Sequence, residues 1–242
     1  MSTFGFRSCT EAVIQGDFEA FKHMHLSGFP LQPTIYNVAA WYGRLDCLQY
    51  AFENECPVGG EATQHVTLNA ANAGHLDCLR FLHTNGFAWH PLTTYVAAEG
   101  GHLDCLQYAY ENGCPLDVDT CRAAAHFGHL ECLQFCHQEG FPWDTLTTSC
   151  AAVNGHVQCL KYASEHGCPW DVSTPYRAAR NGHLECLQYA HEHGCPWDQR
   201  TIEEAIAHNQ LECLRFAHTH GCPWDENSTL NAARSGTLRL RV

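Results

Sequence analysis

The chain has 242 residues, of which 26 are acidic and 13 basic, and its formal net charge is −13. This charge repels a phosphate backbone and no stripe of lysine or arginine offsets it, so the composition argues against nucleic-acid binding. No run of about 18 apolar residues occurs and Met1–Phe6 lacks an apolar signal region, so we expect a soluble, intracellular, cytoplasmic protein without a membrane span.

A repeated unit organises the sequence from its beginning to its end. The same glycine returns at 27-residue intervals, with one interval of 31 residues between Gly43 and Gly74. A fixed period of 20 to 50 residues is typical of a solenoid, in which each repeat packs only on its neighbours. The marker positions are Gly16, Gly43, Gly74, Gly101, Gly128, Gly155, Gly182, Asn209 and Gly236.

One copy of the repeat predicts two short helices joined by a tight turn. Ser173 and Thr174 precede Pro175, a pattern typical of a helix start, and predict a first helix over Tyr176–Asn181. Gly182 then closes that helix in the left-handed region, and a second helix follows over Leu184–His193. Helices of this length are unstable alone, so stacking must stabilise them. We therefore predict an all-α solenoid of helix-turn-helix repeats.

The pattern T-P-x-x-A-A-x-x-G-H-L-E resembles the ankyrin repeat. It is present as Thr174-Pro175, Ala178-Ala179, Gly182-His183 and Leu184-Glu185. The usual ankyrin period is 33, and the shortening falls where ankyrins carry a β-hairpin finger. The resemblance, which is to the divergent arrays of protists, oomycetes and large DNA viruses, therefore implies an ankyrin-like array with shortened or absent fingers. It also implies a scaffold that binds a protein partner through its concave face.

The repeats predict a single domain over residues 1–242. Residues 8–30 form an atypical N-terminal repeat that suits a cap, and regular repeats follow over 34–225. The four extra residues fall within 58–63, where we expect a longer loop. The last copy, 228–242, is too short for a second helix, so we expect a monomer in which self-association is possible at this incomplete end.

Sixteen cysteines and 18 histidines raise a competing class, a metal-binding or thiol-redox protein. No C-x-x-C pair occurs, and Phe87 and Phe141 replace the cysteine of the linker set in two copies. We therefore expect no metal site and no cofactor, with the thiols acting as small apolar side chains. The helical set is Cys47, Cys78, Cys105, Cys132, Cys159, Cys186 and Cys213, and the linker set is Cys56, Cys114, Cys168, Cys195 and Cys222.

Two further ladders recur once per copy. Tryptophan in the linker, replaced by aliphatic residues in other copies, predicts a buried structural stack rather than a binding surface. Histidine follows the turn glycine, and in ankyrin-like arrays a residue there ties successive repeats by hydrogen bonds. No nucleophile recurs with a base and an orienting acid, so we expect no enzyme. The ladders are Trp89, Trp143, Trp170, Trp197 and Trp224, and His75, His102, His129, His156 and His183.

The pair of residues before each turn glycine varies between copies while the frame is constant. Variable positions on a constant frame are natural contact points, and aromatic and arginine side chains dominate many interfaces. In ankyrins this pair borders the concave groove. The alternative, that these side chains are only solvated or locally packed, stays open, as does an adaptor role in a degradation complex, although no F-box-like segment is visible. We expect a protein partner with a basic patch, and the candidate residues for binding it are Trp41, Tyr42, His126, Phe127, Arg180 and Asn181.

Overall fold

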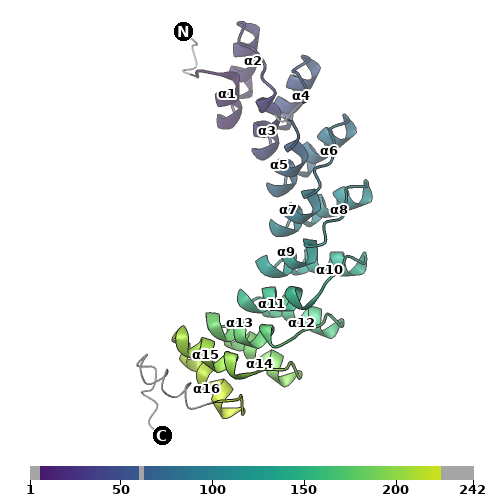
Figure 1. Ribbon diagram of the computed structural model, residues 1–242. Coiled ribbons are helices and arrows are strands. Elements are labelled where there is room, and N and C mark those ends of the chain that lie inside the picture. Colours follow the sequence, from purple (N-terminus) through teal and green to yellow (C-terminus); the bar gives the residue numbers. More distant parts are fainter. Residues whose placement is uncertain (1–5, 60–62, 225–242) are drawn as a thin grey trace. The chain divides into compact units, whose positions relative to one another are not determined.

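The computed structural model describes residues 6–59 and 63–224, which form sixteen helices and no strand (Figure 1). The predicted terminal repeat, 228–242, and most of the four-residue insertion lie outside the described residues. The helices are α1 (Cys9–Gln15), α2 (Phe18–Leu26), α3 (Thr34–Trp41), α4 (Leu45–Glu53), α5 (Val66–Asn72), α6 (Leu76–Thr84), α7 (Thr93–Glu99), α8 (Leu103–Glu111), α9 (Thr120–Phe127), α10 (Leu130–Gln138), α11 (Thr145–Val153), α12 (Val157–Glu165), α13 (Ser173–Asn181), α14 (Leu184–Glu192), α15 (Gln199–Ala207) and α16 (Leu211–Thr219).

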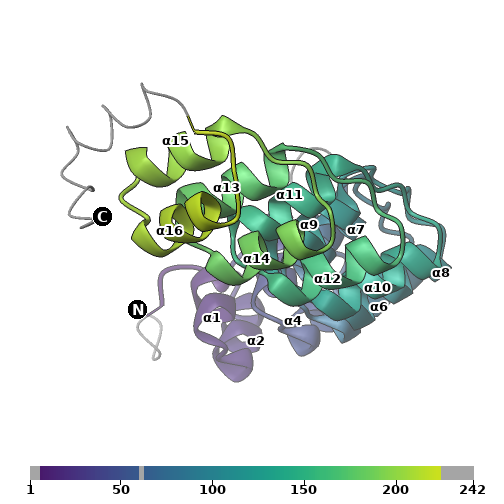
Figure 2. The same cartoon turned by 90° about the horizontal axis from the view of Figure 1, so that it is seen from below.

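The helices belong to two compact units, Met1–Thr120 and Cys121–Val242. In the first unit, α1, α3, α5 and α7 pack in one row and α2, α4, α6 and α8 in a second (Figure 1). In the second unit, α11, α13 and α15 form one row, and α10, α12, α14 and α16 form the other (Figure 2). Each pair therefore packs on the pairs before and after it within its unit, as a repeat solenoid requires. That the whole chain is a single domain stays a prediction.

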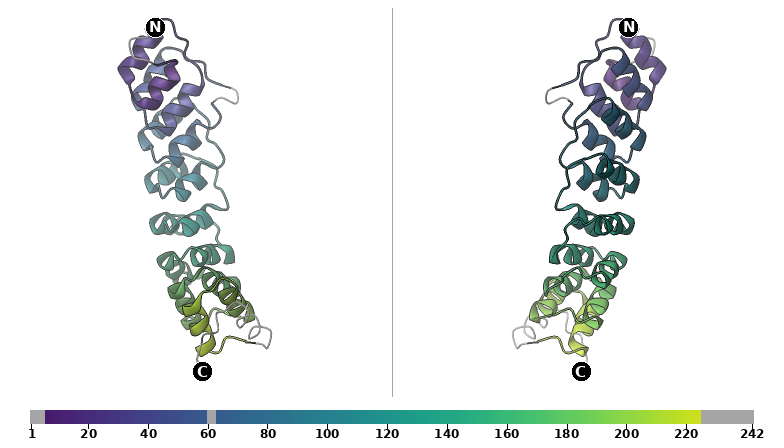
Figure 3. Two further views of the ribbon diagram at one scale, coloured as in Figure 1. Left: turned by 90° about the vertical axis from the view of Figure 1, so that its left-hand side faces the viewer. Right: turned by 90° about the vertical axis from the view of Figure 1, so that its right-hand side faces the viewer.

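The linkers between repeats contain no strand within the described residues, so the chain carries no β-hairpin finger there. In the first unit these linkers run along one edge of the helix stack (Figure 3). The predicted shortening of the repeat therefore removes the finger and leaves a direct connection between consecutive helix pairs.

The turn between the two helices of each copy is left-handed, as the glycine spacing predicts. Gly155 and Gly182 have φ of 75° and 76°, and Asn209, which replaces the glycine, has φ of 57°. Asparagine is among the few residues that enter this region at low cost. The left-handed turn thus explains why this position keeps glycine or asparagine in every copy and shows the repeat period most clearly.

The start of the first helix differs from the sequence prediction. Helix α13 begins at Ser173 rather than Tyr176, because the Asp171 carboxylate accepts a hydrogen bond from the Ser173 N–H at 2.8 Å. Asp144 forms a full capping box with Thr147 at the start of α11. The linker aspartate is therefore the N-cap residue of α11 and α15, and at α13 Asp171 accepts from the first helical N–H from one position before the N-cap, Val172.

Buried threonines instead tie one repeat to the next. The Thr148 hydroxyl donates to the Pro169 carbonyl at 3.1 Å, and the Thr174 hydroxyl lies 3.4 Å from that of Thr148. Thr67 makes the same type of bond to the Ala88 carbonyl at 3.2 Å. These bonds satisfy hydroxyl groups inside the core and connect helix one to the linker that follows the second helix.

The core of each unit lies between its two rows of helices. The leucine in the middle of each second helix from α4 onward is fully buried, and the alanine pairs of the first helices have no exposed surface. Alanine allows neighbouring helices to approach closely, while leucine supplies most of the buried apolar area. The leucines are Leu48, Leu79, Leu106, Leu133, Leu160, Leu187 and Leu214.

Candidate protein-binding surface

In the first unit, the exposed aromatic pair Trp41 and Tyr42 lies at the C-terminal end of α3. Their exposed fractions are 45% and 43%, whereas Ala39 and Ala40 in the same helix are completely buried. The repeat frame therefore turns the alanines inward and leaves both large rings in solvent. Exposed aromatic rings at the end of a rigid helix are suited to a contact with a partner.

In the second unit, the corresponding helix ends are connected to one another along the row of first helices. The His126 ring lies edge-on to Phe127, with ring centroids 4.7 Å apart, and its Nδ1 lies 2.9 Å from the Asn154 amide. One repeat later, the Asn181 amide donates to the Val153 carbonyl at 3.0 Å. Phe127 stays 42% exposed. His126 and Asn181 therefore have a packing role in addition to any role in binding.

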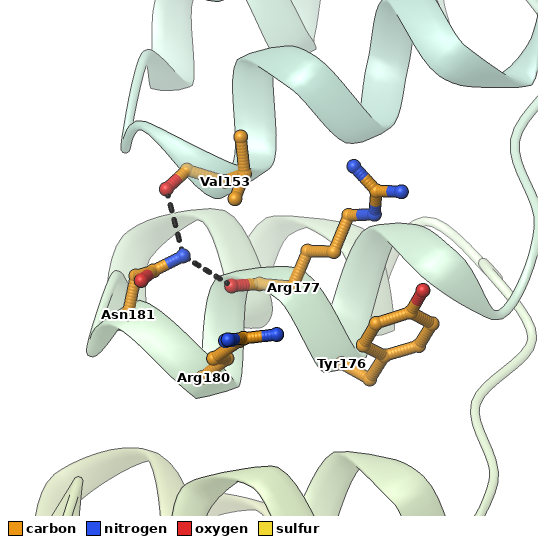
Figure 4. Close-up of a pocket in the computed structure, with 5 residues that line it drawn as sticks. All are labelled: Val153, Tyr176, Arg177, Arg180 and Asn181. Atoms are coloured by element: carbon orange, nitrogen blue, oxygen red, sulfur yellow. Dashed lines mark hydrogen bonds between the residues drawn. The ribbon is translucent and has the colours of Figure 1, made fainter. Parts of the chain in front are cut away.

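A pocket of about 390 Å³ lies beside these contacts, between α11 and α13 (Figure 4). The Arg177 side chain extends from α13 towards α11, where Val153 lies across from it. Arg180 leaves the next turn of α13, and its Nε lies 3.8 Å from a Glu204 carboxylate oxygen of α15. The pocket is lined by Val153, Tyr176, Arg177, Arg180 and Asn181.

The sequence candidates occupy both units, with Trp41 and Tyr42 in the first and the other four in the second. Arg180 and Asn181 line the same pocket, while His126 and Phe127 lie on α9. Sequence reasoning missed Tyr176 and Arg177, which line that pocket as well. The available signal was a pair of arginines three residues apart on one helix of a strongly acidic chain.

The histidine ladder packs over the turn glycines. The His102 Nε2 bonds to the Asn72 carbonyl at 3.1 Å, which confirms for this copy that the histidine ties successive repeats. A Cβ atom on Gly74 would lie 2.5 Å from the ring of His102, and one on Gly155 would lie 2.6 Å from that of His183. The glycine is therefore needed for space as well as for its backbone conformation, which the sequence did not predict.

The tryptophan ladder is stacked on histidine in three copies, and its rings are half-buried where the sequence predicts a buried stack. The Trp143 indole stacks on the His137 ring at 4.2 Å and 12°, and His137 Nδ1 lies 2.8 Å from the Tyr162 hydroxyl of the next copy. Burial, followed by the nearby charge of His166, lowers the pKa of His137. Trp197 stacks on His191 in the same way. An imidazole ring covers one face of the indole in Trp89, Trp143 and Trp197, whereas Trp170 and Trp224 make edge contacts, with Tyr189 and His218.

All sixteen cysteines lie within the described residues as free thiols, and all except Cys150 are buried. In the helical set, burial and the adjacent Glu131 raise the pKa of Cys132 to about 12. In the linker set, the Cys168 and Cys222 thiols donate to carbonyl oxygens 24 residues earlier, at 3.3 and 3.2 Å. The linker cysteines therefore have the structural role that the sequence predicts, because they bond one linker to the preceding one.

The described part of the chain contains no cluster of three or more histidine, cysteine, aspartate or glutamate side chains that could hold a metal ion. None of its helices has the length and apolar character needed to cross a membrane.

Both a family model and solved structures match this chain. Residues 121–162 and 149–191 match the family model described as ankyrin repeats in many copies. Among solved structures, the human ASB11 ankyrin repeat domain aligns with a TM-score of 0.62 at 20% identity, covering 78% of this chain and 99% of that one. A search of curated proteins finds no significant match. The solved domain supports the similarity of fold, and the family model supports the type of repeat.

Proposed function

Because the chain belongs to the ankyrin repeat family, we propose that it is a non-catalytic scaffold that binds a protein partner. The contact would be made by the exposed ends of its first helices, which border the concave face in this family. The observation that carries this proposal is the exposure of Trp41, Tyr42 and Phe127 at equivalent positions of a frame that is otherwise buried. Frame residues have packing partners, whereas these rings contribute little to the core.

The net charge bears on the kind of partner. With a formal charge of −13, the protein attracts a partner with a basic surface at long range and speeds its association. We therefore propose a partner with a basic patch and an association rate that falls as salt concentration rises. The buried free thiols fit a reducing compartment, so we place the protein inside the cell, in the cytoplasm.

Affinity capture followed by titration of the captured partner tests the proposal. We expect the variant carrying Trp41→Ala, Tyr42→Ala, His126→Ala and Phe127→Ala to bind at least tenfold more weakly, since aromatic anchors often contribute about 2 kcal/mol or more. The matched control replaces two exposed apolar linker residues, Leu116 and Val118, by alanine and should bind as the wild type does. Equal loss in both variants would contradict the assigned surface.

Metal analysis of the purified protein, with thiol titration under native conditions, separates this proposal from the metal-binding or thiol-redox class. Stoichiometric zinc together with protected linker thiols would favour that competing class. The hydrogen bonds of the linker thiols to backbone carbonyls support the structural role instead.

A further inference from the structure

The pocket between α11 and α13 is a cationic site on an acidic protein. Arg177 and Arg180 both line it, and the guanidinium of Arg177 has no hydrogen bond or ion pair within the described part of the chain. Arg180 is 52% exposed on its side chain and has only the 3.8 Å contact with Glu204. By contrast, the nearby Arg200 is held by Asp198 at 2.9 Å and Arg122 by Asp144 at 3.2 Å. The two arginines that line the pocket are therefore free to bind an anion, whereas Arg200 and Arg122 are already paired with aspartates.

The remaining walls of the pocket suit a side chain that is apolar along its stem and anionic at its end. Val153 and the Tyr176 ring supply apolar surface, and the Asn181 amide is anchored on the Val153 carbonyl at 3.0 Å. A guanidinium binds a carboxylate through two parallel hydrogen bonds, which gives strength and direction. A nucleic acid is disfavoured, because its phosphates would extend beyond the pocket over a molecule with a net charge of −13, whereas a short peptide can place its carboxylates at the arginines.

We propose that this pocket binds a glutamate or aspartate side chain of an acidic peptide segment in the partner. This inference rests on the proposed function, because it names the chemistry of one contact on the same surface. It is compatible with a partner that is basic elsewhere. The net charge of this protein attracts such a partner at long range, whereas the two arginines bind a carboxylate only after the surfaces meet. At about 0.15 M salt, charges more than roughly 8 Å away are largely screened, so the local arginines dominate.

Fluorescence anisotropy with a labelled hexaglutamate peptide and the full chain at 0.15 M salt tests the proposal. We expect hexaglutamate to bind, and hexaglutamine to bind at least about tenfold more weakly. The variant with Arg177→Gln and Arg180→Gln should lose about tenfold or more of the hexaglutamate affinity. The matched control, Arg215→Gln, removes an equally exposed arginine of α16 and should bind as the wild type does.

A second variant tests the site in the opposite direction. Glu204→Gln removes the carboxylate that lies near Arg180, so hexaglutamate should bind about threefold more tightly. Weaker binding by this variant, equal binding of hexaglutamine, or equal loss with Arg215→Gln would overturn the proposal. A phosphoserine peptide that binds where hexaglutamate does not would also overturn it. Because this readout uses a defined peptide and arginine variants, its failure is distinguishable from failure of the aromatic capture experiment.

Discussion

At the scale of single residues, small and medium side chains repeat because each has a fixed neighbour in the next copy. Cys186 and Leu187 are both fully buried in α14, and Ala178 and Ala179 are buried in the helix that packs against it. The cysteine at this position is a small apolar side chain rather than a reactive thiol, since burial raises the pKa of Cys186 to about 12. The repeated composition therefore reflects repeated packing.

Replacing Leu187 by alanine tests that packing in the middle of the second unit. We expect the free energy of unfolding to fall by about 2–5 kcal/mol, because a buried leucine leaves a cavity that its neighbours fill only in part. Urea unfolding followed by circular dichroism measures the change. The exposed Leu211, at the start of α16, is the matched control and should cost much less on the same replacement. An unchanged unfolding curve for Leu187→Ala would contradict the burial.

Protonation of His137 should destabilise the fold as pH falls. Burial against Trp143 and the charge of His166 lower its folded pKa below the unfolded value of about 6.5, so the unfolded chain binds the proton first. The contribution to stability is therefore complete above about pH 6.5 and is lost as pH falls from there towards the folded pKa. His90 and His156 have pKa values lowered in the same direction.

Melting temperatures between pH 7.5 and 5.5 measure this effect. We expect His137→Gln to show a smaller loss on acidification than the wild type, although it should also lose the stacking on Trp143 at both pH values. The exposed His23, replaced by glutamine, is the control and should keep the wild-type pH dependence. Identical pH dependence in His137→Gln would exclude this histidine as a source of acid sensitivity.

At the scale of the element, the structural unit is a helix pair. It includes the histidine of the next pair, which packs over the glycine in the turn of this one. The ring of His183 packs over Gly155, so the turn of one copy and the second-helix start of the next are in contact. Gly167 ends a second helix with a similar φ of 80°, but nothing lies within 4 Å of where its Cβ would be. A side chain at Gly167 would therefore cause only backbone strain, whereas a side chain at Gly155 would cause backbone strain and a steric clash.

Alanine replacement of these two glycines tests that distinction. Gly167→Ala should cost about 1–2 kcal/mol, the usual penalty of the left-handed region, and Gly155→Ala should cost about 1–3 kcal/mol more because of the clash with His183. Adding His183→Ala to Gly155→Ala should remove the extra cost in a double-mutant cycle. Urea denaturation of the four variants gives the values, and equal costs for the two single glycine variants would refute a packing role.

At the scale of the whole molecule, the described repeats form two units in which each helix pair depends on its neighbours. Fifteen buried thiols and one partly exposed thiol, Cys150, are distributed over both units. Burial, which disfavours the thiolate, raises the pKa of Cys159 to about 11 and that of Cys186 to about 12. The number of thiols that react with a reagent therefore shows whether the repeats are folded.

Native thiol titration should accordingly detect at most about one reactive cysteine per chain at pH 8, the partly exposed Cys150. All sixteen should react after unfolding in guanidinium chloride, which serves as the control for the total. Rapid native reaction of several linker thiols would contradict their burial and would strengthen the competing redox interpretation.

The sequence by itself determined the helix pairs, the left-handed turns and the buried cysteine and leucine positions, because each follows from a local preference repeated at a fixed period. Only the tertiary structure decided where the first helices begin, that histidine rings fill the space over glycines, that the tryptophans are half-exposed, and that Arg177 shares a pocket with Arg180. The histidine contacts and the pocket join residues about 20 to 30 positions apart, so a single copy of the repeat contains only one side of each contact.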